Sequence, residues 1–231
     1  MFSQIAYEWP QFATYYNLIF LAKAAGTTLA LSALGVILGS LLGLVLAVTR
    51  ATRSPWLAPL RIIAFAFTEI FRRVPFLVTL MLAFFVFQMF LADTSLFLVA
   101  AVTTTLIAAA YLSEIIRGGL NSVHLNQWEA AVAMNFTLLQ TIRLVILPQA
   151  WRIILPPAFG FFVLFIKDTA LASQIGVVEL TFAGKVLNNK GFSPTLAFGA
   201  ILVIYFMISY PLARLGAALE ANLASSRHHR P

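Results

Sequence analysis

The sequence contains no cysteine among its 231 residues, and it carries little charge. Without thiols, neither a disulfide framework nor a thiolate metal site can form, and His124, His228 and His229 offer no cluster of ligands. Only 10% of the residues are charged, whereas 61% are hydrophobic. That balance is typical of integral membrane proteins and far from the soluble average, so we predict an all-α membrane protein without a bound metal.

A nucleotide-binding motif is also absent. The pattern G-x-x-x-x-G-K-[ST] has no match, because Gly184-Lys185 lacks both the upstream glycine and the following hydroxyl. We therefore expect no catalytic residue, no cofactor bound by this chain and no enzyme activity of its own. The net charge of +7 could indicate nucleic acid, but arginine and lysine lie between hydrophobic runs instead of forming a stripe with aromatic residues. We predict no nucleic-acid partner.

Long apolar runs predict about five membrane spans within one transmembrane domain covering residues 1–231. The predicted spans lie at residues 24–48, 74–92, 96–116, 149–167 and 195–213. The first has no charge and reaches roughly 37 Å as a helix, which is enough to cross the hydrocarbon core with some tilt. Within it, Gly35, Gly39, Gly43 and Ala47 recur every four residues, which predicts a flat face that packs closely against another helix.

The distribution of basic residues predicts the orientation of the spans. On the five-span arrangement eleven arginines lie on one side and three lysines on the other, and the positive-inside rule makes the arginine side cytoplasmic. The N-terminus is then outside and the C-terminus inside. An odd number of spans without an internal repeat argues against the inverted-repeat secondary transporters. The eleven are Arg50, Arg53, Arg61, Arg72, Arg73, Arg117, Arg143, Arg152, Arg214, Arg227 and Arg230, and the three are Lys23, Lys185 and Lys190.

One long stretch, Arg117 to Pro148, is too polar for lipid and forms the predicted cytoplasmic loop 118–148 between spans 3 and 4. Asn126 with Glu129, and Thr137 with Gln140, each place a capping side chain three residues before its reciprocal partner. The loop therefore predicts two short helices.

The sequence also predicts how each of these two helices ends. Asn135 lies between the two helices, where a left-handed residue could end the first, and Pro148 is predicted to limit the second. Ala130, Ala131 and Ala133 add little bulk to the first helix, which suits it for docking on a partner.

Several motifs in and around this loop resemble a known family. Gln127-x-Glu129-Ala130-Ala131, followed by Ile146-Leu147-Pro148, resembles the EAA loop of permease subunits in binding-protein-dependent ABC importers. The flanking YLSEIIRGGL (111–120) and FIKDTALAS (165–173), together with FRRVP (71–75), resemble the branch that imports polar amino acids. The family pattern usually has glycine where Asn135 stands.

The resemblance implies a type I ABC importer permease in the bacterial cytoplasmic (inner) membrane, with a coupling helix in its loop. It implies a second permease subunit, identical or different, and two ATPase subunits that hold ATP and Mg. The other implied partners are an extracytoplasmic amino-acid-binding protein and membrane lipid. The residues implied to couple to the ATPase are Gln127, Glu129, Ala130, Ala131, Asn135, Leu147 and Pro148.

Charged residues in apolar segments are candidates for the substrate path. Lys167 and Asp168 interrupt an apolar run beside Thr169, and a charge at the centre of a spanning helix costs roughly 2.5 to 3.5 kcal/mol, so they should face protein or water. They either bind the charged group of an amino acid or form a structural pair at a helix break. Glu114 and Arg72 are further candidates. A mutual ion pair of Glu114 with Arg117, and an interfacial anchor at Arg72, are the structural alternatives.

Two functions follow from these observations. The first is the permease subunit of an ATP-driven importer of a polar amino acid. The second is a membrane channel or scaffold subunit whose cytoplasmic loop binds a cytosolic partner. Periodicity and topology do not separate them, whereas the combined motifs favour the first.

Overall fold

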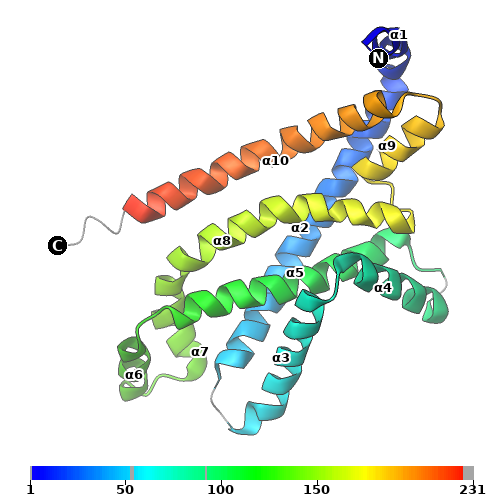
Figure 1. Ribbon diagram of the computed structural model, residues 1–231. Coiled ribbons are helices and arrows are strands. Elements are labelled where there is room, and N and C mark those ends of the chain that lie inside the picture. Colours follow the sequence, from blue (N-terminus) through cyan, green and yellow to red (C-terminus); the bar gives the residue numbers. More distant parts are fainter. Residues whose placement is uncertain (1, 53–54, 92, 226–231) are drawn as a thin grey trace. The chain divides into compact units, whose positions relative to one another are not determined.

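The computed structural model describes residues 2–52, 55–91 and 93–225, which form helices and loops without any strand (Figure 1). Arg53, Arg227, Arg230, His228 and His229 lie outside these residues. The chain divides into two compact units. The elements are α1 (Phe2–Phe12), α2 (Tyr15–Ala51), η1 (Pro55–Leu57), α3 (Ala58–Arg73), α4 (Phe76–Phe90), α5 (Leu96–Asn121), α6 (Leu125–Ala133), α7 (Leu138–Gln140), η2 (Thr141–Ile146), α8 (Leu147–Asp168), η3 (Thr169–Ile175), α9 (Leu180–Asn189) and α10 (Pro194–Ser225).

Four helical segments are long and apolar enough to cross a membrane, and a bent pair of helices makes a fifth if the pair counts as one span. The four are Tyr15–Ala51, Leu96–Asn121, Leu138–Ile175 and Pro194–Leu223, and the bent pair joins Pro55–Arg73 to Phe76–Phe90 at 111°. The prediction of an all-α membrane protein with about five spans is confirmed. The exact span boundaries and the single transmembrane domain over residues 1–231 stay predictions.

The second predicted span, 74–92, does not form as one straight helix starting at residue 74. Val74 has an extended backbone, with φ −81° and ψ 132°, and α4 begins only after Pro75. Proline disfavours the helical conformation in the residue before it, which explains the break. With 15 residues, α4 is roughly 22 Å long, which is short for a bilayer.

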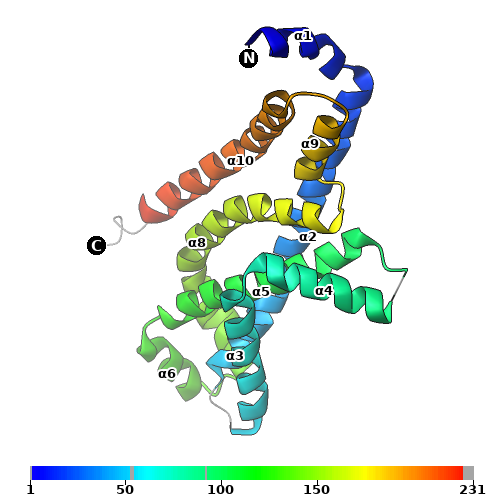
Figure 2. The ribbon, with the colours of Figure 1, turned by 45° about the vertical axis from the view of Figure 1, so that its right-hand side comes forward.

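The first unit comprises Met1–Gly35, Phe76–Thr104 and Val163–Leu212. In one of its cores α9 lies beside the beginning of α2, as Figures 1 and 2 both show. A second core joins the middle of α2 to α4, to the start of α5 and to η3. The fully buried members of these cores include Leu31, Leu80, Ala100, Leu180, Ala183 and Leu187.

The second unit comprises Val36–Pro75, Thr105–Phe162 and the described residues from Ala213 onward. Here α2 packs directly on α5: a Cβ atom at Gly39 would lie 2.6 Å from the Ala108 Cβ atom. At Gly43 it would lie 3.0 Å from the Ala109 carbonyl oxygen. Ala47, one turn further on, is fully buried. The predicted flat face is therefore confirmed, because the missing side chains let the two backbones touch.

The helical segment from Leu138 continues through Pro148, which contradicts the prediction that this proline limits a short helix. The π-helix η2 precedes Pro148, and the Leu147 N–H bonds to the Ile142 carbonyl five residues back. A wider π turn changes the hydrogen-bond register ahead of the proline, and the missing proline N–H is tolerated in the first turn of α8. The second loop helix thus merges with the spanning helix.

Candidate coupling loop and polar sites

The beginning of α6 differs from the predicted capping box. His124 is the N-cap residue, and its Nδ1 atom accepts a hydrogen bond of 3.4 Å from the Asn126 N–H. Asn126 lies inside the helix, and Glu129 is its fifth residue, past the first turn. The predicted reciprocal pair of Asn126 and Glu129 is therefore wrong. Glu129 is exposed and makes no hydrogen bond or ion pair with any residue that the structure describes.

The turn after α6 follows the prediction. Asn135 has φ 57°, in the left-handed region. Its N–H bonds to the Val132 carbonyl, and the Phe136 N–H bonds to the Ala131 carbonyl, which together form a Schellman motif. Thr137 and Gln140 then form the predicted capping box at the start of α7. This turn fixes the direction in which the chain leaves α6.

Buried contacts attach α6 to the ends of the longer helices of its unit. Trp128, partly buried, packs on a core that includes Ala47, Ile116, Leu120, Ile146 and Ala150, and Leu147 packs there too. The Gln149 side-chain amide nitrogen Nε2 donates to the Gln127 side-chain oxygen Oε1 at 3.2 Å. Figure 1 shows α6 beyond the end of α5. The loop is thus attached by packing and by a hydrogen bond to the ends of α2, α5 and α8.

Ala131 serves this attachment and does not face a partner. Its side chain is fully buried, whereas Ala130 and Ala133 are exposed. The expectation that Ala131 itself offers a docking surface is therefore corrected, because a residue buried inside its own chain cannot contact another protein. Pro148 is exposed in the first turn of α8.

A hollow of about 730 Å³ lies beside α6. Its wall is largely apolar, and Leu125 and Val132 are more than half exposed. Glu129 contributes a carboxylate to the same wall. The lining residues are Ala51, Asn121, Val123, Leu125, Trp128, Glu129, Val132, Ala133 and Leu138. A protein element with an apolar side chain and a basic group would fit this surface.

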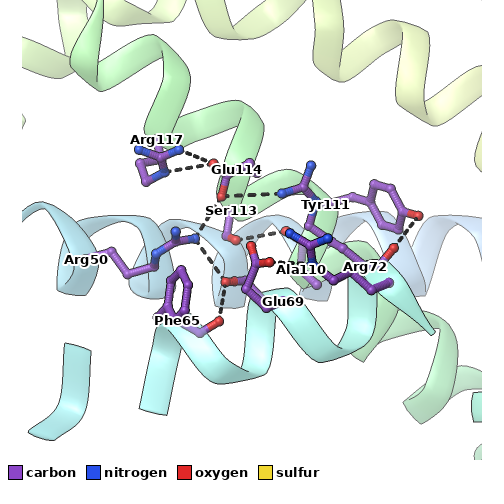
Figure 3. Close-up of polar contacts among 11 residues, drawn as sticks. Arg50, Phe65, Glu69, Arg72, Ala110, Tyr111, Ser113, Glu114 and Arg117 are labelled. Carbon is purple, nitrogen blue, oxygen red and sulfur yellow. Dashed lines mark hydrogen bonds and ion pairs between the residues drawn. The ribbon is translucent and has the colours of Figure 1, made fainter. Parts of the chain in front are cut away.

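Glu114 on α5 is surrounded by three arginines from three helices (Figure 3). Its Oε2 atom lies 2.8 Å from Arg50 Nη1 and 3.7 Å from Arg72 Nη1, and its Oε1 atom accepts from Arg117. The predicted pair of Glu114 with Arg117 is confirmed as part of a larger cluster. Because both carboxylate oxygens are engaged, the geometry favours a structural role for Glu114 over substrate binding.

Arg50 and Arg72 make further contacts in this cluster. Arg50 Nη1 also donates to the Thr68 hydroxyl at 3.0 Å, its guanidinium lies 5.4 Å from the Phe65 ring centre, and its side chain is only 10% exposed. Arg72 lies over the Tyr111 ring at 5.8 Å. The cluster thereby joins α2, α3 and α5.

Lys167 and Asp168 lie at the end of α8, directly before the change to the 3₁₀-helix η3. Both are exposed, and within the described residues neither takes part in an ion pair or a side-chain hydrogen bond. Lys167 lines a hollow of about 400 Å³ with Ala170, Leu202, Tyr205, Phe206 and Ser209. Thr169 is fully buried, and its hydroxyl donates to the Ile166 carbonyl at 2.7 Å. The two charges are available to a ligand, whereas the Thr169 hydroxyl is already used.

Sequence reasoning missed two carboxylates that hold the first unit together. Glu179 is fully buried and accepts from the N–H groups of Thr181 and Phe182 and from the Tyr205 hydroxyl. Glu179 is the N-cap residue of α9, and because glutamate is not one of the usual N-cap residues, no local sequence signal pointed to it. Glu8 on α1 accepts hydrogen bonds from the backbone N–H and the hydroxyl of Ser193, directly before α10. These hydrogen bonds lower the pKa of Glu8, and the backbone N–H has the largest effect.

Comparison with known sequences decides the family. Residues 35–223 match the family described as binding-protein-dependent transport system inner membrane component. The chain belongs to this family. It is therefore a transmembrane permease subunit of a multi-pass inner-membrane transport system, which confirms the localisation and the class of protein predicted from the motifs.

Individual relatives agree with this assignment. This permease is 35% identical over 205 residues to the glutamine transport system permease protein GlnP of Escherichia coli K12, covering 88% of this chain and 92% of that protein. It is 34% identical over 197 residues to the L-cystine transport system permease protein TcyB of Bacillus subtilis, covering 85% and 83% respectively. The crystal structure of an amino acid ABC transporter with histidines superposes with a TM-score of 0.79 at 28% identity, covering 89% of this chain and 94% of that one.

A fourth likeness concerns the fold alone. An inward-facing structure of the MetNI methionine ABC transporter has a TM-score of 0.75 at 23% identity, covering 91% of this chain and 99% of that chain. The permease fold of ABC importers, expected from the motifs, is thereby confirmed.

Proposed function

We propose that this permease subunit imports a polar amino acid, with uptake driven by ATP hydrolysis on separate subunits. An external binding protein delivers the amino acid, two permease subunits form the path, and two ATPase subunits hold ATP and Mg. The relatives named above support an amino acid as cargo, and a binding-protein-dependent family requires the delivering protein. This chain contributes the path and the coupling loop.

The observation that carries the proposal is that Glu129, on an α6 attached to the longer helices, has no partner among the described residues. A helix that transmits motion must be fixed to the membrane helices and yet offer unused surface to its partner. The Gln127–Gln149 hydrogen bond and the partly buried Trp128 support the first requirement. The exposed Glu129, beside an apolar hollow, supports the second. We propose that this surface seats on the ATPase.

The proposed orientation has the N-terminus outside and the loop in the cytoplasm. Cysteines introduced at Gln127 and at Asn188 then report opposite sides of the membrane in a chain that has no native cysteine. In intact cells a membrane-impermeant maleimide should label Asn188→Cys, whereas Gln127→Cys should react only after the membrane is opened. External labelling of Gln127→Cys would contradict this orientation.

For the cargo, we propose that Lys167 and Asp168 contact the charged groups of the amino acid. Both charges are unpaired among the described residues, and a membrane protein retains such charges where they face ligand or water. Lys167→Gln is expected to raise the substrate concentration for half-maximal uptake about tenfold, because a charge-assisted hydrogen bond to a carboxylate is lost. Asp168→Asn should do the same through the amino group.

The measurement uses the complete complex in vesicles with its binding protein, tested with each amino acid in turn. Lys190→Gln is the matched control, because it removes a lysine from the end of α9, outside the Lys167 hollow. Unchanged uptake by both Lys167→Gln and Asp168→Asn would refute their contact with substrate. Uptake that proceeds without ATP hydrolysis would refute the importer and favour a channel.

A further inference from the structure

A pocket lined by three arginines lies at the edge of the Glu114 cluster. Arg50, Arg61 and Arg117 line a pocket of about 330 Å³ together with Ile62 and Phe65. All five residues belong to one compact unit. Three guanidiniums around one small pocket are unusual in a chain of which only a tenth is charged. The coupling and substrate proposals use none of these residues.

The charges in this pocket are only partly compensated. Glu114 is the acidic partner of Arg50 and Arg117 among the described residues, and it also contacts Arg72. Arg61 donates to the backbone carbonyl of Thr52 at 2.8 Å, which supplies no negative charge. Because each guanidinium carries five N–H donors, Arg61 and Arg117 keep donors for a further acceptor. The pocket therefore suits an anion with several oxygens.

The pocket also has an apolar side. Ile62 is 67% exposed and Phe65 is 52% exposed, and their neighbours Leu60 and Ile63 on α3 are exposed as well. Arg50 is next to last in α2, and Arg117 lies in the final turns of α5, where spanning helices leave the hydrocarbon core. An anion bound here would thus have lipid acyl chains beside it. A soluble anion would make no use of this apolar edge.

We infer that this pocket binds the phosphate group of an anionic phospholipid, with its acyl chains along Ile62 and Phe65 of α3. Arg61 and Arg117 hold the phosphate oxygens, and Arg50, fixed by Glu114 and Thr68, contributes its charge from the wall. Basic pockets between spanning helices are suited to such headgroups. In the proposed orientation this phospholipid lies in the cytoplasmic leaflet.

The test measures the thermal unfolding midpoint of the purified, delipidated complex in a neutral detergent, without substrate or ATP. Short-chain phosphatidylglycerol is titrated in, and phosphatidylcholine of the same chain length and glycerol 3-phosphate are titrated separately. Phosphatidylglycerol should raise the midpoint saturably, and the other two should leave it unchanged. Arg61→Gln should weaken the apparent affinity for phosphatidylglycerol about tenfold, which is the loss of one charge-assisted contact.

Arg152→Gln is the matched control, because Arg152 is exposed on α8 and outside the pocket. It should respond to phosphatidylglycerol as the unaltered complex does. Each midpoint is compared with the same variant without lipid, so a change in basal stability does not mimic lost binding. An equal response of Arg61→Gln and the unaltered complex would overturn the site, and an equal response to glycerol 3-phosphate would overturn the lipid. Because no transport step is measured, failure here is distinct from failure of the proposed importer.

Discussion

Glu129→Lys is expected to reduce substrate uptake by roughly two orders of magnitude while leaving synthesis and membrane insertion intact. The carboxylate is exposed beside the α6 hollow and has no partner among the described residues, so it contributes little to the fold of its own chain. Reversing its charge against a basic partner group would place like charges together at the interface. Co-purification of the ATPase and uptake in vesicles are the two measurements.

Two variants separate coupling from a general effect of charge. Glu129→Gln removes the charge but keeps a hydrogen-bonding side chain, so it should lose less activity than Glu129→Lys. Glu220→Lys makes the same change at an exposed site late in α10 and should transport normally. Full transport by Glu129→Lys would show that this surface does not couple the permease to its ATPase.

A steric variant tests the same surface without charge. Ala133→Trp adds bulk at the wall of the hollow and should also prevent seating, whereas Ala221→Trp adds it at an exposed position on α10. Ala131→Trp is not suitable, because that side chain is buried and the change would disturb the loop itself. Normal uptake by Ala133→Trp would exclude the hollow as the seat.

Glu114→Gln is expected to lower the stability of the subunit by about 2 to 3 kcal/mol, because it leaves the largely buried Arg50 guanidinium without its acidic partner. Arg50 would keep its charge with a side chain that is only 10% exposed. For a chain of this size that corresponds to roughly 10 °C in the thermal unfolding midpoint. Tryptophan fluorescence during heating of the detergent-purified complex would measure it.

The control for this prediction is a second acidic residue on the same unit. Glu69 pairs with Arg73 at 2.5 Å, but that arginine side chain is 77% exposed, so Glu69→Gln should cost no more than about 1 kcal/mol. Adding Arg50→Gln to Glu114→Gln should restore part of the loss, since the unpaired charge disappears. A midpoint for Glu114→Gln equal to that of the unaltered complex would contradict a stabilising role for the cluster.

Features that depend on residues close together along the sequence could be predicted. Hydropathy indicated about five spans, the four-residue spacing of Gly39, Gly43 and Ala47 indicated the face that α5 contacts, and Thr137 with Gln140 indicated a capping box. Asn135 adopts the expected left-handed turn. In each case the signal lies within one or two helical turns, so the physics that causes it is local.

Other features were decided only by segments that meet in space. Arg50 and Glu114 are 64 residues apart, and only the packing of α2 on α5 brings them together at 2.8 Å. From the sequence, Ala131 was predicted to contact a partner, but the folded loop buries it. Pro148 was predicted to end a helix, but the π-helix η2 before it lets the helix continue. Sequence by itself determined the membrane class, the approximate number of spans and the family motifs of this permease. Tertiary structure decided which charges are paired and which stay free for partners, because pairing and burial depend on distances between helices that local patterns do not contain.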